Sequence, residues 1–250
     1  MQEIYMKTAV VTGASRGIGA ACAIALAKNG YNIVLGYKQN RQRAEQLCQV
    51  IISSYGVGAK AVCADVACSA DADALVEAAA RDFGCTVDVL VNNAGIAQQK
   101  LFTDITDEDW NAMIGTDLTG AFNCSRAAAR YMIKQKSGII INISSMWGQV
   151  GASCEVHYSA AKAGLIGMTK ALAKELAPSG IRVNCVCPGV VMTDMMSDFD
   201  DDTMRELADE TPLGRIGKPK DIADMVGFLC SDRGEFITGQ VIGVNGGFVI

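Results

Sequence analysis

Short runs of β-branched and aliphatic residues alternate along the whole chain with longer segments of helical periodicity. Strands that alternate with helices are typical of βαβ units, whose strands run parallel in one sheet. The segment 139–143 is apolar except for Asn142, as expected of a sheet covered by helices on both faces. The pattern predicts an α/β fold, a Rossmann-like doubly wound sandwich with a seven-stranded parallel sheet. We expect strands at 8–12, 32–37, 60–64, 87–92, 138–143, 181–186 and 239–244, and helices at 17–29, 41–55, 71–83, 107–135, 158–176 and 219–230.

Composition narrows the class of protein. Half of the 250 residues are hydrophobic, and no linker or repeat divides the chain, so we expect residues 1–250 to form a single domain. The 22 basic and 27 acidic residues give a net charge of −5, which argues against a nucleic-acid partner.

The sequence carries no obvious signal for a membrane or for export. The opening residues include an acid and no basic region, and no apolar run is long enough to span a bilayer, so we expect a cytoplasmic protein. The ten cysteines are scattered without a CxxC pair, and His157 is the only histidine. These counts favour reduced thiols over a disulfide scaffold and leave little for a metal site.

A glycine-rich turn lies between the first expected strand and the first expected helix. Gly13, Gly17 and Gly19 are spaced so that backbone amides at the helix N-terminus can approach a pyrophosphate. The strand before the turn and the helix after it give this motif the context that a dinucleotide site requires.

The residues after the second expected strand bear on the choice of cofactor. An NAD site places an acid there to bind the ribose 2′-hydroxyl, but this strand ends at Tyr37 and is followed by Lys38. Arg16 within the glycine turn supplies a second cation that could meet a 2′-phosphate. The sequence therefore predicts NADP(H) rather than NAD(H).

Tyr158 and Lys162 lie one helical turn apart in an expected helix, so their side chains share one face. An ammonium beside a phenol lowers the pKa of the phenol, which would suit Tyr158 to act as a general acid toward a carbonyl oxygen. Two further polar motifs follow expected strands, Asn92 to Gly95 and Ser144-Ser145.

Taken together, these motifs resemble the short-chain dehydrogenase/reductase family over nearly the full length. The resemblance implies that Ser145 hydrogen-bonds the substrate oxygen, Tyr158 donates the proton, and Lys162 tunes Tyr158 and holds the ribose. Pro188, Gly189 and Thr193 match the family's PGxxxT, and Asp65-Val66 match its adenine contact. The implied cofactor site comprises Gly13, Ser15, Arg16, Gly17, Ile18, Gly19, Tyr37, Lys38, Asp65, Val66, Asn92, Ala94, Gly95, Tyr158, Lys162, Pro188, Gly189, Val191 and Thr193.

One position departs from the family's pattern. Where the family has an asparagine that orders a water of the proton relay, this chain has Asp117. A carboxylate can accept a hydrogen bond or pair with Lys162, but it cannot donate as an amide does. We include Asp117 among the catalytic residues, and we expect it to affect the rate or the pH optimum.

The tail at 238–247 and the segment at 212–223 resemble the family's 3-oxoacyl-[acyl-carrier-protein] reductases. This resemblance implies reduction of a β-keto thioester in fatty acid biosynthesis by a homotetramer. The acidic carrier protein would then be a partner, and Lys134 and Lys136 could form part of a basic rim for it.

Two other functions stay open. The segment 144–158 resembles a subgroup that reduces the 5-aminopentanone modification of elongation factor P, where Glu155 could pair with the amine and Trp147 could offer a ring face. In a different class, Asp117 would mark a catalytically idle scaffold that binds NADP(H).

The irregular acidic stretch 192–215, which includes Asp194, would form a lid with a short helix.

Overall fold

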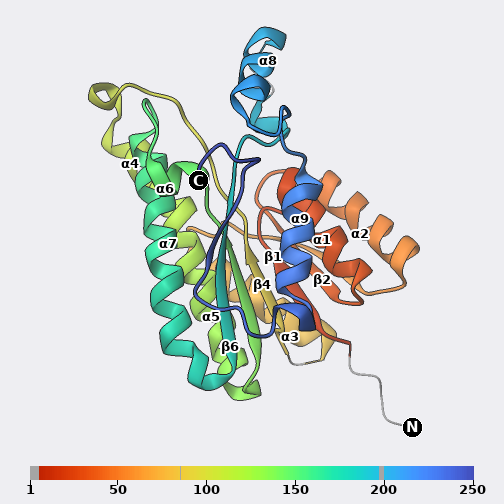
Figure 1. The fold of residues 1–250 in the computed structure, drawn as a ribbon. Helices are drawn as coiled ribbons and strands as arrows, with labels where there is room; N and C mark the ends of the chain where they lie inside the picture. The colour runs from red at the N-terminus through yellow and green to blue at the C-terminus, as the bar shows by residue number, and fades with distance from the viewer. Residues whose placement is uncertain (1–5, 85, 197–199) are drawn as a thin grey trace.

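The computed structural model describes residues 6–84, 86–196 and 200–250. Its centre is one parallel sheet with the strand order β3-β2-β1-β4-β5-β6-β7, which confirms the predicted fold class (Figure 1). The strands are β1 (Thr8–Val11), β2 (Asn32–Tyr37), β3 (Ala59–Cys63), β4 (Val89–Asn92), β5 (Gly138–Ile143), β6 (Ile181–Pro188) and β7 (Val241–Val244).

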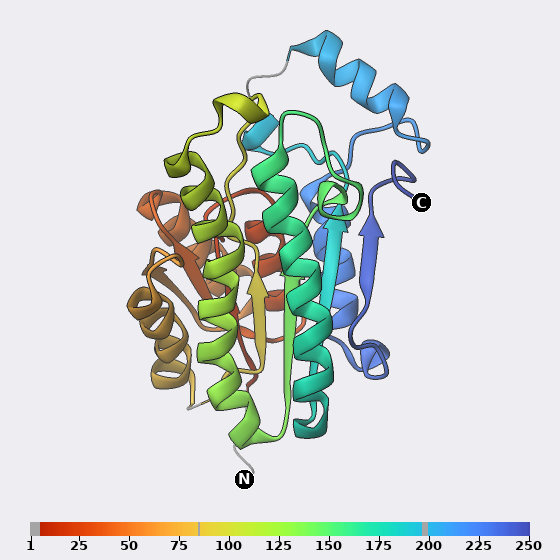
Figure 2. The same ribbon diagram turned by 90° about the vertical axis from the view of Figure 1, so that its left-hand side faces the viewer.

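Helices cover both faces of the sheet, as Figure 2 shows from the side of α5 and α7. The helices are α1 (Gly17–Lys28), α2 (Arg41–Tyr55), α3 (Ser69–Phe83), α4 (Asp107–Ile114), α5 (Gly120–Gln135), α6 (Met146–Val150), α7 (Val156–Leu176), α8 (Asp201–Glu210) and α9 (Pro219–Leu229). One hydrophobic core lies between the sheet and α1, α2 and α9, and includes Leu26, Ile51 and Leu229. A second lies between the sheet and the other layer, and includes Leu75 and Met132.

The predicted helix over 107–135 is interrupted. Residues Gly115–Thr119 form a π-helical turn between α4 and α5, and Asp117 lies within that turn. Hydrophobic periodicity continues through a single wide turn, so the pattern does not reveal it, whereas such turns often accompany functional residues. The short α6 was also not predicted, and it begins where the Ser145 hydroxyl accepts a hydrogen bond from the Trp147 amide.

The acidic stretch after β6 contains the helix that the sequence predicts there. Asp200 is the N-cap of α8, with its side chain accepting a hydrogen bond from the Thr203 amide. No residue of α8 is buried, and the helix stands above the carboxyl end of the sheet (Figures 1 and 2). Residues 197–199 of the predicted lid lie outside the described residues.

The structure also bears on membrane-spanning helices and on the state of the cysteines. Within the ranges that the structure describes, no helix is long and apolar enough to cross a bilayer. The cysteines in those same ranges are all free, and Cys22, Cys124 and Cys230 are among the buried ones.

Candidate active site

The motifs that follow the strands meet at one edge of the sheet. Because all seven strands are parallel, the glycine turn after β1 lies at the same edge as the segments after β4, β5 and β6. Ligands of open α/β sheets bind at this carboxyl edge, beside the strand at which the strand order reverses. Here that strand is β1, between β2 and β4.

The glycine turn is shaped by the segment after β4. The Asn93 side-chain amide donates to the backbone oxygens of Thr12 (3.0 Å) and Gly13 (3.2 Å). In return, the Thr12 hydroxyl accepts hydrogen bonds from the amides of Asn93 and Ala94, both at 2.9 Å. Gly13 has φ +62°, and a Cβ there would come within 2.8 Å of the Ala94 Cα. Asn93 was not among the predicted site residues, yet its side chain holds the glycine turn in place.

The start of α1 fits a pyrophosphate. Its N-cap, Arg16, makes no side-chain capping bond, and no acidic residue occupies the first turn. The first backbone N–H groups of a helix have no intrahelical acceptor, and the helix dipole favours negative charge there. Ser15, Gly17, Ile18 and Gly19 surround this end of the helix and would hold the phosphates.

The two predicted cations lie at this edge, and each has an acidic partner. Lys38 Nζ lies 2.6 Å from Asp65 Oδ2, and this ammonium is the main reason that the pKa of Asp65 is lowered. Arg16 Nη1 lies 3.2 Å from Asp194 Oδ2. Lys38 was expected to be available to a phosphate, but the Asp65 carboxylate already compensates its charge.

Three other predicted cofactor residues stand at or after the carboxyl ends of β2, β3 and β4. Tyr37 ends β2 and is buried, and its carbonyl accepts a hydrogen bond from the Ala64 amide. The Val66 carbonyl accepts one from the Asn123 side chain at 3.1 Å. Asn92 is buried in the sheet, where its side-chain amide donates to Ser125 Oγ (2.9 Å) and Asn142 Oδ1 (2.8 Å).

The segment after β6 lies close to the glycine turn. Pro188 ends β6, and the Gly189 amide donates to the carbonyl of Val244. Val191 is buried and pairs with Gly217 in an isolated bridge. A Cβ on Gly17 would lie 3.4 Å from the Thr193 methyl group. The PGxxxT segment and the glycine turn therefore lie next to each other at the carboxyl edge of the sheet.

The catalytic candidates come together at the N-terminal half of α7. Lys162 Nζ lies 5.5 Å from the centre of the Tyr158 ring and donates to the carbonyl of Ile143, at the end of β5, at 3.2 Å. Ser145 follows the same strand, and its side chain lies close enough to Tyr158 to lower the pKa of the phenol, against the larger effect of burial. The predicted grouping of Ser145, Tyr158 and Lys162 is thus present in the structure.

The pKa of Tyr158 differs from the expectation. Burial raises it above its ordinary value and outweighs the Lys162 ammonium, which lowers it, while the Asp117 carboxylate raises it further. The spacing in the sequence predicted a lowered pKa because it indicates the nearby ammonium but not the burial of the phenol. In this site the phenol stays protonated at neutral pH, which is the form that can donate a proton.

Asp117 is directly coupled to Lys162. Its Oδ2 lies 3.0 Å from Lys162 Nζ, and its Oδ1 accepts a hydrogen bond from the Ile96 amide at 2.9 Å. Burial alone would lower the pKa of Lys162, but the charges of Asp117 and Tyr158 raise it overall. A Cβ on Gly95 would lie 2.7 Å from Asp117 Oδ2, so a side chain there would collide with the pair.

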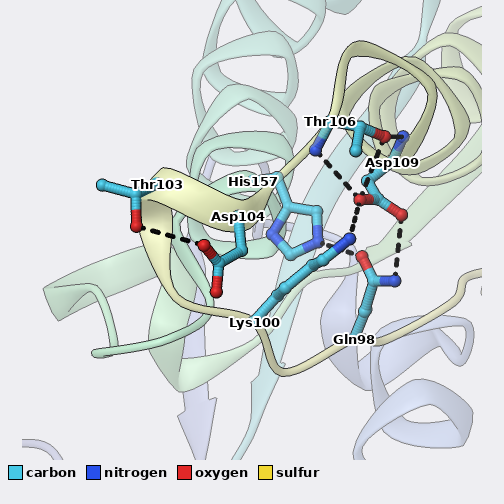
Figure 3. Close-up of polar contacts among 7 residues, drawn as sticks. All are labelled: Gln98, Lys100, Thr103, Asp104, Thr106, Asp109 and His157. Atoms are coloured by element: carbon cyan, nitrogen blue, oxygen red, sulfur yellow. Dashed lines mark hydrogen bonds and ion pairs between the residues drawn. The ribbon is translucent and has the colours of Figure 1, made fainter.

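A polar network connects the segment after β4 to α4 and α7 (Figure 3). Asp109 accepts hydrogen bonds from Gln98 Nε2 (3.0 Å), Lys100 Nζ (2.5 Å) and the Thr106 amide (3.0 Å). Gln98 Oε1 lies 2.9 Å from Nε2 of the fully buried His157, the residue before Tyr158. Because Gln98 donates through its nitrogen, its oxygen must accept, so His157 Nε2 carries the proton.

Two further predicted substrate residues lie near the start of α7: Trp147 belongs to α6, and Glu155 is the N-cap of α7. Glu155 is about half buried, and burial raises the pKa of its carboxyl group. Its Oε1 accepts a hydrogen bond from Gln99 at 3.3 Å. The Trp147 ring makes an edge-to-face contact with Phe248, with 5.8 Å between the ring centres.

The chain is similar to known proteins over nearly its whole length. The model of the family described as enoyl-(acyl carrier protein) reductase matches residues 13–249. The chain is also 44% identical over 241 residues to the 3-oxoacyl-[acyl-carrier-protein] reductase FabG of Staphylococcus aureus, covering 96% of this chain and 97% of that one. The chain belongs to the short-chain dehydrogenase/reductase family. It is therefore an oxidoreductase, and the family's cofactor is a nicotinamide dinucleotide.

Other members of the short-chain dehydrogenase/reductase family match equally completely. The 3-oxoacyl-[acyl-carrier-protein] reductase of a Synechocystis strain is 43% identical and is covered in full, as is this chain. The uncharacterized oxidoreductase YmfI of Bacillus subtilis is 42% identical, covering 97% of this chain and 98% of that one. A crystal structure described as a short-chain alcohol dehydrogenase from Sinorhizobium meliloti superposes with a TM-score of 0.92 at 37% identity, covering 97% and 96% of the two chains.

Proposed function

We propose that this protein uses NADPH to reduce a ketone, and that the ketone belongs to a 3-oxoacyl thioester carried by an acyl carrier protein. The observation that carries this proposal is the grouping of a protonated phenol, a hydroxyl and a buried ammonium at the carboxyl edge of the sheet, from Tyr158, Ser145 and Lys162. The curated relatives named as 3-oxoacyl-[acyl-carrier-protein] reductases support the substrate class.

The side chains divide the work of ketone reduction. The bound nicotinamide supplies the hydride. Ser145 donates a hydrogen bond to the ketone oxygen, and Tyr158 transfers its phenolic proton to that oxygen as negative charge develops. Lys162 stabilises the resulting phenolate with its charge, which Asp117 maintains in the buried site.

The proposal assigns the cofactor groups to the residues that border the glycine turn. The start of α1 would hold the pyrophosphate, and Lys162 would hold the nicotinamide ribose. Asp65 and Val66 would contact the adenine, and Thr193 would contact the carboxamide. The preference for NADPH rests on the cations at the carboxyl ends of β1 and β2 and on the absence of an acid directly after Tyr37.

The direct test is a cofactor oxidation assay with the purified protein. We expect NADPH to be consumed in the presence of an acetoacetyl thioester, faster with the acyl-carrier-protein thioester than with the free one, and slowly with NADH. Tight NADPH binding without turnover of any ketone would instead support the idle scaffold. We also propose that the protein is a cytoplasmic homotetramer, and its mass in solution tests the oligomeric state.

A second candidate substrate is a ketone that carries an amine, such as the 5-aminopentanone modification of elongation factor P. The observation that favours it is the half-buried Glu155 carboxylate close to Tyr158, because burial makes its charge costly without a cationic partner. If this candidate is right, Glu155→Gln greatly slows reduction of the modified elongation factor and leaves acetoacetyl thioester reduction unchanged. Equal rates of the variant and the wild type on the modified factor would exclude it.

A further inference from the structure

Two arginines from different elements converge on one carboxylate beside the glycine turn. Arg43 Nη1 lies 2.7 Å from Asp194 Oδ2, and Arg16 Nη1 lies 3.2 Å from the same oxygen. Arg16 is the N-cap of α1, and Arg43 belongs to the first turn of α2. Asp194 is more than 150 positions away from either of them in the sequence, 151 from Arg43 and 178 from Arg16. Arg43 was not among the residues predicted for the cofactor site.

The position of this cluster in the fold suits it to bind an anion near the cofactor ribose. In a doubly wound sheet, the ribose next to the first glycine turn lies near the carboxyl end of the second strand. Arg16 belongs to that turn, and α2 is the helix that follows β2. Two guanidinium groups that share a carboxylate oxygen are an anion site, and guanidinium binds phosphate through paired hydrogen bonds better than an ammonium does.

The neighbouring cations, Lys38 and Arg41, pair with carboxylates that lie within 30 residues of them in the sequence. Lys38 pairs with Asp65 at 2.6 Å, and Arg41 pairs with Glu45 at 2.7 Å. The partner of Arg16 and Arg43, in contrast, comes from the segment after β6. The three side chains are about half exposed, at 56%, 52% and 46%, so solvent screens the interaction and its loss costs little.

We propose that Arg16 and Arg43 bind the 2′-phosphate of the cofactor, and that Asp194 is a built-in competitor that occupies this subsite in the free protein. The inference rests on the proposed use of NADPH. A 2′-phosphate brings more negative charge and more acceptor oxygens than one carboxylate, so it displaces Asp194 and takes over both guanidinium groups. Asp194 thus lowers the affinity for the phosphorylated cofactor and leaves the affinity for NADH unchanged.

The test uses nucleotide fragments that cannot react, so it does not depend on catalysis. Binding of 2′,5′-ADP and of 5′-AMP is measured by calorimetry for the wild type, Asp194→Asn, Arg43→Ala, Lys38→Ala and Arg41→Ala. We expect Asp194→Asn to tighten 2′,5′-ADP by roughly threefold to tenfold without changing 5′-AMP. Arg43→Ala should weaken 2′,5′-ADP by about tenfold or more. Arg41→Ala, the matched surface arginine, should change neither.

The outcomes separate this inference from the proposed function. If the wild type binds both nucleotides equally, NADPH dependence is wrong and the inference falls with it. If the wild type prefers 2′,5′-ADP but Asp194→Asn does not tighten it, or if Lys38→Ala weakens it more than Arg43→Ala does, the inference alone is wrong. Equal tightening of both nucleotides by Asp194→Asn would also overturn it, because competition at the 2′-phosphate must spare 5′-AMP.

Discussion

The Asp117 carboxylate lies 3.0 Å from the Lys162 ammonium, and both side chains are almost completely buried. The same carboxylate raises the pKa of Tyr158 as well as that of Lys162. A single negative charge, delivered by a π-helical turn, therefore acts on the whole catalytic pair. In this buried site its influence is weakly screened, because little solvent surrounds the three groups.

Asp117→Asn should shift the pH dependence of ketone reduction. Reduction needs the protonated phenol, so activity is lost as the pH rises through the pKa of Tyr158. Removing the carboxylate removes a cause of the raised pKa, so the alkaline limb of kcat/KM should move to lower pH. Asp224→Asn, at an exposed ion pair with Lys220, is the control. An alkaline limb that does not move would show that Asp117 does not act on Tyr158.

Gly95→Ala should lower turnover because its methyl group would press on the catalytic pair. The added Cβ would lie 2.7 Å from Asp117 Oδ2 and 3.3 Å from Lys162 Nζ, so the ion pair has to move. We expect kcat to fall by about tenfold or more. Gly167→Ala is the control, because nothing lies within 4 Å of its Cβ. It should keep its activity and gain about 0.5–1 kcal/mol of stability, since it lies within α7.

Asp109→Ala should loosen the segment after β4 that contains Gln98 and Lys100. Gln98, Lys100 and both the amide and the hydroxyl of Thr106 lose their common acceptor, and Gln98 connects to His157. We expect KM for the ketone to rise several-fold while the dissociation constant of NADPH stays the same. Asp104→Ala is the control on the same segment, because Asp104 accepts from its neighbour Thr103 (Figure 3). A matching rise in the dissociation constant of NADPH would contradict a substrate-side role.

Stability should fall at alkaline pH because of the buried thiols. Burial raises the pKa of Cys124 from 9.0 to about 12, so the folded chain keeps a proton that the unfolded chain releases above pH 9. This stabilisation is complete below pH 9 and is lost as the pH rises to about 12, at about 1.4 kcal/mol per pH unit.

Melting temperatures measured from pH 8 to pH 11 check this. Cys124→Ala should flatten the decline above pH 9, and Cys63→Ala, at an exposed position, should leave the slope unchanged. The same slope in all three proteins would mean that the buried thiol does not contribute.

The sequence predicted most of the architecture because its strands are apolar runs and its motifs follow them directly. The expected strand at 239–244 begins instead at Val241, since Gly239 adopts φ +72°, which is not an extended conformation. The expected helix over 107–135 concealed the π-helical turn at Asp117, because one extra residue in a turn barely changes the hydrophobic pattern.

The sequence predicted which residues form the site more completely than it predicted their pKa values and their contacts. Spacing alone places Tyr158 beside Lys162, but it does not give the burial that reverses the shift in the tyrosine pKa. The pairing of Arg43 with Asp194 joins residues that no local pattern connects. Asn93 could have been noticed, because it stands within the motif after β4, but only the structure shows it bonded to the glycine turn.

The most direct measurement is the rate of NADPH oxidation with an acetoacetyl thioester for the wild type and Tyr158→Phe, together with NADPH binding by fluorescence. If Tyr158 is the proton donor, the variant binds NADPH like the wild type and loses about 10²-fold to 10⁴-fold in kcat. Turnover of the variant within tenfold of the wild type would contradict the assignment of Tyr158 and the proposed mechanism with it.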